Sequence, residues 1–137
     1  MKRIADTGLL KAAMDADDRA HPWAARQFRE YAPFHTCEAV LVELAFLLGT
    51  PVPGLQLIIR GDLILEFDLA AEIGPVLDLL QKYRDRKMDL ADACVVRLTE
   101  LHAQSKVWTV DWRDFSIYRR HGKHAIPCEF PPVRQRF

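Results

Sequence analysis

Two carboxylates begin a segment of the chain that is otherwise apolar. Asp89 precedes the run Leu90–Leu101, whose apolar residues recur at close to helical spacing, and Asp92 follows one turn later. The neighbours of Asp92 are alanine, cysteine and valine, so a buried Asp92 carboxylate needs a cation, a network of donors or a metal beside it. A second helix cap or a buried salt bridge is the simpler alternative.

Two further acids stand out in the same way. Glu43 is the one polar residue between Ala39 and Leu48, and a helix that is apolar on nearly every side is expected to be buried on nearly every side. Asp6 follows the short stretch Arg3–Ala5, at the expected carboxyl end of a strand, where α/β sheets place their ligands. Alternatively, Asp6 only caps the following helix, and the head group of Glu43 reaches water.

A fourth acid, Asp111, directly follows the expected strand 106–110. Asp114 comes three residues later, in front of a short helix, and is expected to be its N-cap. If the four acids converge at one edge of a sheet, their like charges require a countercharge. Carboxylate oxygens suit Mg²⁺ or Mn²⁺ rather than Zn²⁺, and such a site activates water and stabilises the charge that develops on a phosphodiester.

Strands and helices alternate along the chain. Thr36 is the expected N-cap of the helix that carries Glu43, and Pro75 is expected to kink the helix 68–83 or to mark its first turn. The alternation predicts a three-layer α/β/α domain with a central parallel sheet, whose strands all end at one edge. Strands are expected at 3–5, 34–35, 63–67 and 106–110, and helices at 9–14, 21–31, 37–48, 55–60, 68–83 and 90–101.

The composition is that of an ordinary globular domain. The chain has 137 residues, 50% of them hydrophobic, which predicts one domain over residues 1–137 with an extended tail from about residue 128. Lysine plus arginine and aspartate plus glutamate both number 19, so a polyanionic partner must be recognised by a local patch. No apolar run approaches the roughly 20 residues of a membrane span, and the first residues do not form a signal peptide. Three widely spaced cysteines suggest reduced thiols and a cytoplasmic location.

Basic residues near the end of the chain are candidates for such a patch. Arg119, Arg120 and Lys123 follow Asp111 closely and could contact RNA phosphates. The alternative is an ordinary solvated turn.

Other chemistries find less support in the sequence. His121, His124 and Cys128 have spacing compatible with zinc, but a fourth ligand is not evident. The chain contains no glycine-rich phosphate loop and no nucleophile elbow.

Several stretches together resemble the PIN domain family and, within it, the VapC-like toxins of bacterial toxin–antitoxin pairs. The resemblance covers nearly the whole chain, with Gly8 where serine is common and Cys37 where serine or threonine is common. The matching stretches are Asp6–Leu10, Asp18–Ala24, Thr36–Leu44, Asp89–Ala93 and Thr109–Phe115.

The resemblance implies a metal-dependent endoribonuclease. Its metal, Mg²⁺ or Mn²⁺, would be held by Asp6, Asp92 and Asp111, with Glu43 as a further ligand or as the general base. Asp89 and Asp114 would be secondary acids of the same site. The resemblance also implies an antitoxin partner and a homodimer, for which the segments 70–83 and 55–59 are candidate contacts.

Two other functions are compatible with parts of this pattern. A catalytically silent PIN module could serve as a binding or regulatory protein, although a drifted module would be expected to have lost at least one of the acids. A phosphohydrolase or receiver-like domain could use Asp6 as a phosphorylated nucleophile. That chemistry needs a lysine after a late strand, whereas Lys106 precedes its strand.

Overall fold

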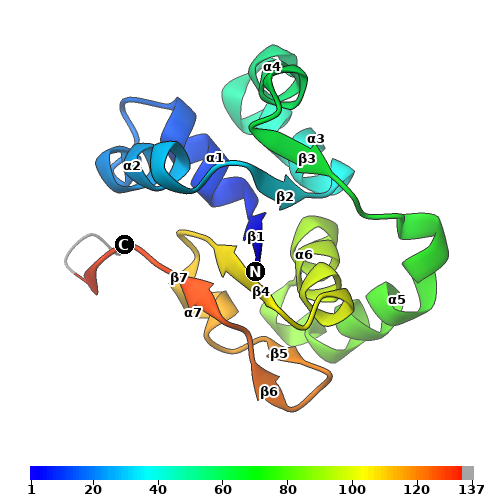
Figure 1. The fold of residues 1–137 in the computed structure, drawn as a ribbon. Helices are drawn as coiled ribbons and strands as arrows, with labels where there is room; N and C mark the ends of the chain where they lie inside the picture. Colours follow the sequence, from blue (N-terminus) through cyan, green and yellow to red (C-terminus); the bar gives the residue numbers. More distant parts are fainter. Residues whose placement is uncertain (134–137) are drawn as a thin grey trace.

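A computed structural model describes residues 1–133 and places a parallel sheet between helices (Figure 1). The strands lie in the order β3-β2-β1-β4-β7, and all four neighbouring pairs are parallel. The strands of this sheet are β1 Lys2–Ala5, β2 Phe34–Thr36, β3 Leu63–Leu65, β4 Ser105–Trp108 and β7 Cys128–Glu129. The predicted α/β class and its central parallel sheet are therefore confirmed.

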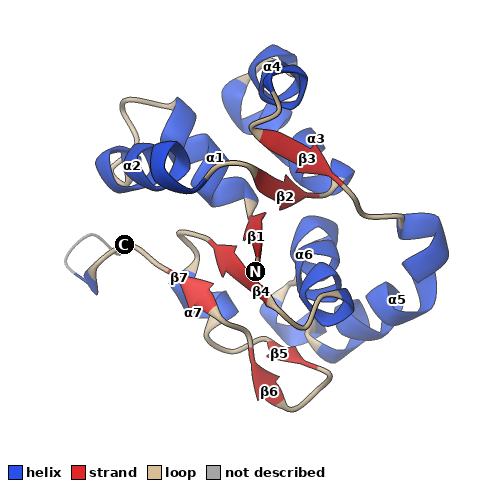
Figure 2. Cartoon of the chain, in the orientation of Figure 1, coloured by secondary structure: helices blue, strands red, loops and turns tan. Residues whose placement is uncertain are grey.

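Helices cover both faces of the sheet, with α1 and α2 on one side and α5 and α6 on the other (Figures 1 and 2). A separate antiparallel hairpin, β5 Arg119–Arg120 with β6 His124–Ala125, lies after the last helix. The helices are α1 Thr7–Met14, α2 His21–Tyr31, α3 Glu38–Leu48, α4 Val52–Arg60, α5 Ile73–Lys82, α6 Leu90–Leu101 and α7 Trp112–Phe115, with 3₁₀ turns η1 Leu69–Glu72 and η2 Arg84–Arg86.

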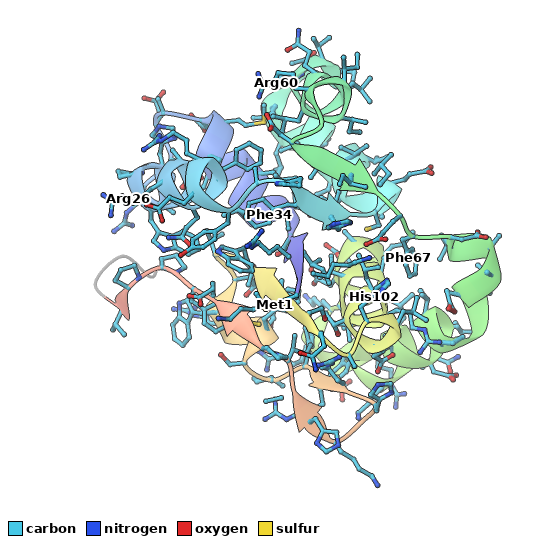
Figure 3. All side chains as sticks on the ribbon, in the orientation of Figure 1. Met1, Arg26, Phe34, Arg60, Phe67 and His102 are labelled. Carbon is cyan, nitrogen blue, oxygen red and sulfur yellow. The ribbon has the colours of Figure 1, made fainter. Side chains whose placement is uncertain are left out.

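The core has an aromatic cluster on the side of α2. Phe34 of β2 is fully buried in the interior (Figure 3), and its ring centroid lies 5.7 Å from that of Phe28 and 5.4 Å from that of Trp108. The indole of Trp108 also donates a hydrogen bond to the Gln27 side chain at 2.8 Å. These contacts fix α2 against β2 and β4, and so fix the strand ends from which the acids emerge.

The segment 68–83 forms two elements rather than one helix. Asp68 caps the 3₁₀ turn η1, and Pro75 lies in the first turn of α5, where its missing N–H costs nothing. Val76 and Leu79 are the buried residues of α5, whereas Ile73 and Leu77 are about half exposed.

Helix α3 contradicts the expectation that it is buried on nearly every side. Only Val40 and Leu44 are buried, while Val42 is 71% and Phe46 84% exposed. Thr36 is not its N-cap either, because Cys37 occupies that position and the Thr36 hydroxyl donates instead to the Ala5 carbonyl at 2.9 Å. Thr36 is not the cap because β2 extends through this residue, so that α3 begins only at Glu38.

The end of the chain contributes the fifth strand. β7 pairs with β4, with Val107 opposite Cys128, and Pro131 is buried. The last four residues of the predicted tail, 134–137, lie outside the described residues.

Candidate functional site

The first part of the site lies where β1 and β4 end side by side. Ala5 is in register with Trp108, and the backbone N–H of Asp6 donates to the Trp108 carbonyl at 3.1 Å, so Asp6 emerges beside Thr109. The Thr109 hydroxyl donates to Oδ2 of Asp6 at 2.8 Å and accepts from the backbone N–H of Asp111 at 3.0 Å. One buried threonine therefore joins the two strand-end acids.

Gly8 is required by the close approach of β4 to α1. A Cβ at this position would lie 2.5 Å from Cγ2 of Val110, a branched side chain with little freedom to move. A side chain larger than hydrogen at this position would therefore collide with Val110.

The amino end of α6 supplies two more acids. Asp89 is the N-cap, as predicted, and its Oδ1 accepts from the backbone N–H of Asp92 at 2.8 Å. Asp92 therefore is not a second cap, and its own Oδ2 accepts from the hydroxyl of Tyr118 at 3.1 Å. The buried residues around it, such as Ala91 and Val95, hold α6 in the core and keep this turn in place.

The N-cap of α7 is Asp111 and not Asp114. Asp111 is the N-cap of α7, and its Oδ1 accepts from the backbone N–H of Asp114 at 3.1 Å. Asp114 lies inside the helix and accepts from Arg86 at 2.7 Å. The prediction of Asp114 as the cap was wrong because the hydrogen bond from Asp111 to Thr109 turns the chain into the helix three residues earlier.

All six acids of the predicted site line one pocket of about 360 Å³. They come from the end of β1, from α3 and from the amino ends of α6 and α7. Lys87 is the one basic side chain among the described residues that line the pocket, and its backbone has a left-handed conformation with φ 56°. The pocket is lined by Asp6, Thr7, Gly8, Glu43, Leu47, Lys87, Asp89, Asp92, Asp111 and Asp114.

The crowding changes the protonation of these acids. Burial raises the pKa of Asp6 to about 7, against the opposing hydrogen bond from Thr109. Burial, followed by the charges of Asp6 and Asp89, raises the pKa of Asp92 to about 8, against the hydrogen bond from Tyr118. The pKa values of Glu43 and Asp111 are also raised, chiefly by burial and then by the neighbouring acids Asp89 and Asp114. The site thus favours a cation that would neutralise it.

We tested whether these residues fit a divalent metal. Within residues 1–133 no three His, Cys, Asp or Glu side chains form a ready ligand group, which also leaves the zinc alternative at His121, His124 and Cys128 without a described site. The donor chemistry nevertheless suits Mg²⁺ or Mn²⁺, since every acid of the pocket offers carboxylate oxygens. The hydroxyl of Thr7 also lines the pocket, and its hydrogen bond to the Glu43 carboxyl opposes the rise in the pKa of that acid. The residues therefore suit a hard cation by donor type alone, since no three of these side chains in the described part of the chain form a ready ligand group.

The basic residues predicted to contact RNA lie elsewhere. Arg119 donates to three backbone carbonyls of the segment 116–118, and Arg120 donates to the carbonyls of Thr99, His102 and Ala103 at the end of α6. Lys123 is exposed at the turn of the β5–β6 hairpin. None of the three lines the pocket.

Sequence reasoning missed three side chains of the site. Lys87 belongs to a connector whose basic character is visible in the sequence, and Thr109 occurs directly after β4, two residues before Asp111. These positions are signals that could have found them. Tyr118 has no such signal, because nothing in the sequence places it next to Asp92.

The three cysteines are free thiols, with Cys37 and Cys94 buried. No helix within residues 1–133 is long and apolar enough to cross a membrane.

The chain matches no protein-family model, and a search of curated proteins finds no match either.

Proposed function

We propose that this protein is a Mg²⁺- or Mn²⁺-dependent endoribonuclease that resembles the PIN-domain toxins of toxin–antitoxin pairs. The observation that carries the proposal is the convergence of six carboxylates from four separate segments on one pocket of about 360 Å³. Such crowding costs stability unless it serves a ligand, because like charges in a partly buried site repel one another.

Asp6, Asp92 and Asp111 are the acids that would hold the metal. When bound, the metal would lower the pKa of a water molecule and stabilise negative charge on the phosphodiester. Thr109 restrains two of these ligands, because it donates to Asp6 and accepts from the backbone of Asp111.

Glu43 is the candidate general base. It is half-buried on α3 beside Asp89, and its raised pKa brings it closer to the range in which a carboxylate accepts a proton from water efficiently. Water would add to phosphorus as its proton passes to Glu43, and the bond from phosphorus to the ribose oxygen would break, with the departing oxygen taking a proton from solvent.

Lys87 is the candidate phosphate contact of the pocket. Arg86, its neighbour, is held by the ion pair with Asp114, whereas Lys87 is exposed at the rim. Its positive charge would partly offset the repulsion between the acids and an approaching RNA backbone.

An antitoxin would need a surface of its own on this chain. A cavity of about 400 Å³ between α1, α2 and α4 is lined mainly by apolar side chains such as Met14, Phe28 and Leu57, with Arg29 and Arg60 also contributing. Its chemistry suits an acidic segment that presents apolar side chains. A second copy of the chain is the other proposed protein partner.

An RNA-cleavage assay with purified protein tests the proposal. We expect cleavage in Mg²⁺ or Mn²⁺, none in EDTA, and a loss of several orders of magnitude in Asp92→Asn, which keeps the shape of the side chain. Asp17→Asn, a change of an exposed acid outside the pocket, is the matched control and should cleave like wild type. RNA binding without cleavage in any metal would favour the silent binding module instead.

A further inference from the structure

Tyr118 lies beneath the acidic pocket and is fully buried. Its hydroxyl donates to Oδ2 of Asp92 at 3.1 Å, and within residues 1–133 it is the one donor to that carboxylate. Oδ2 of Asp92 therefore accepts a hydrogen bond from the protein, whereas Oδ1 accepts none from residues 1–133. A carboxylate tied by one oxygen can rotate far less than a free one.

The ring of Tyr118 is held from two sides. Its centroid lies 5.0 Å from the ring of Tyr83 and 5.2 Å from that of Phe115, both in edge-to-face geometry. Phe115 belongs to α7, the helix capped by Asp111, so the same aromatic cluster connects two of the proposed metal ligands. The position of the hydroxyl is thus fixed by packing, not by the hydrogen bond alone.

The backbone that carries Tyr118 is also anchored. The N–H of Arg119 donates to the Tyr83 hydroxyl at 2.9 Å, and the Arg119 guanidinium donates to the Tyr118 carbonyl at 3.0 Å. The guanidinium of Arg120, the residue after Arg119, donates to the Thr99 carbonyl at 2.6 Å. This hydrogen bond ties the segment to the carboxyl end of α6. Two arginines that the sequence offered for RNA binding thus secure the segment that presents Tyr118 to Asp92.

From this arrangement we infer that Tyr118 is a positioning residue of the metal site, holding the Asp92 carboxylate so that one oxygen remains for the cation. The inference rests on the proposed function, since it requires that Asp92 binds a divalent metal. Removing a group that orients a metal ligand typically weakens metal affinity by about 10- to 100-fold.

Tyr118→Phe tests this role, because phenylalanine keeps the ring packing and removes only the hydroxyl. Tyr31→Phe is the matched control: it removes a hydroxyl from the aromatic cluster around Trp108, and Tyr31 does not line the pocket. The readout is the Mn²⁺ or Mg²⁺ concentration at which the melting temperature of each purified protein has risen by half of its maximal metal-induced increase.

We expect Tyr118→Phe to melt near wild type without metal and to need about 10- to 100-fold more metal, whereas Tyr31→Phe behaves like wild type. In an Asp92→Asn background, adding Tyr118→Phe should change nothing further. Equal metal requirements for Tyr118→Phe and wild type, or equal shifts in both tyrosine variants, would overturn the inference alone. A wild-type protein whose melting temperature does not respond to metal would overturn the proposed function together with it.

Discussion

The two acids with the highest pKa values make the stability of the metal-free protein depend on pH. The pKa of Asp6 is raised from 3.8 to about 7, and that of Asp92 from 3.8 to about 8. A carboxyl group whose pKa is higher in the folded protein binds its proton more tightly there. It therefore contributes stability below the unfolded value, and this contribution is lost as the pH rises through the folded value.

We expect the metal-free melting temperature to fall as the pH rises from about 4 to about 8, the interval that these two pKa values define. Above this interval Asp92→Asn should melt higher than wild type, because it removes a partly buried charge. Its melting temperature should also fall much less than that of wild type as the pH approaches 8. Calorimetry across the interval measures both effects, with the exposed Asp17→Asn as control. A wild-type melting temperature that rises across the interval would contradict the assigned environment of the two acids.

Single residues differ in how well the sequence revealed them. Asp6, Glu43 and Asp92 could be predicted because a charged side chain in an apolar segment needs a partner, and the pocket brings them together. The contacts of Thr109 and Tyr118 could not, since a threonine or a tyrosine is ordinary in a buried segment, although the position of Thr109 directly after β4 marks it as a candidate. Their roles depend on contacts that span 103 and 26 residues of the chain, which no local pattern encodes.

At the scale of elements, variants at the start of α7 can distinguish helix capping from catalysis. Asp111 caps this helix and also lines the pocket, so it carries both functions. Asparagine caps a helix about as well as aspartate does, whereas alanine does not, and losing a cap costs about 1 kcal/mol.

We therefore expect Asp111→Asn to melt near wild type and to be almost inactive, while Asp111→Ala is inactive and less stable by about 1 kcal/mol. Asp114→Asn breaks a partly exposed ion pair with Arg86 and should change stability little. Denaturant unfolding and cleavage rates of the three variants distinguish these roles. If Asp114→Asn lost more stability than Asp111→Ala, the cap would be assigned to the wrong acid.

Element boundaries show where local patterns stop being sufficient. α2 spans the predicted range 21–31, with Pro22 at its start, and α6 begins after the predicted cap Asp89. The start of α7 was misplaced because Asp111 and Asp114 are both good caps. The local hydrogen bond from the Asp111 backbone to Thr109, whose hydroxyl in turn donates to Asp6, decides between them. α3 was expected to be buried because its composition is apolar, but composition cannot tell a core face from a face left exposed on one chain.

For the whole molecule, the alternation of strands and helices was enough to predict the sheet and the edge at which Asp6 and Asp111 meet. Right-handed crossovers between parallel strands leave few alternatives, so the topology follows once the elements are known. The fifth strand, β7, was not predicted, because Cys128–Glu129 is too short to show an alternating pattern.

An apolar surface lies beside the acidic pocket. Val42 and Phe46 of α3, with Leu90 of α6, line a hollow of about 480 Å³ that shares Glu43 and Asp89 with the acidic pocket. Exposed apolar patches of this kind mark interfaces, and a homodimer would bury each such side chain twice, once on each copy. The sequence had pointed to 55–59 and 70–83 instead, where Ile59 and Ile73 are also exposed.

We expect light scattering to show a dimer at micromolar concentration, and Phe46→Glu to convert it to a monomer. Burying a phenylalanine is worth about 1.5–3 kcal/mol, so losing it on both copies costs about 3–6 kcal/mol, or roughly two to four powers of ten in Kd. Ile73→Glu, on α5, is the matched change outside the hollow and should leave the dimer intact. A monomeric wild type would exclude the homodimer, whereas a monomer produced by Ile73→Glu but not by Phe46→Glu would move the interface to α5. Because the hollow adjoins Glu43 and Asp89, the Phe46→Glu monomer should also be measured for cleavage, and normal activity there would show that the pocket works without a second copy.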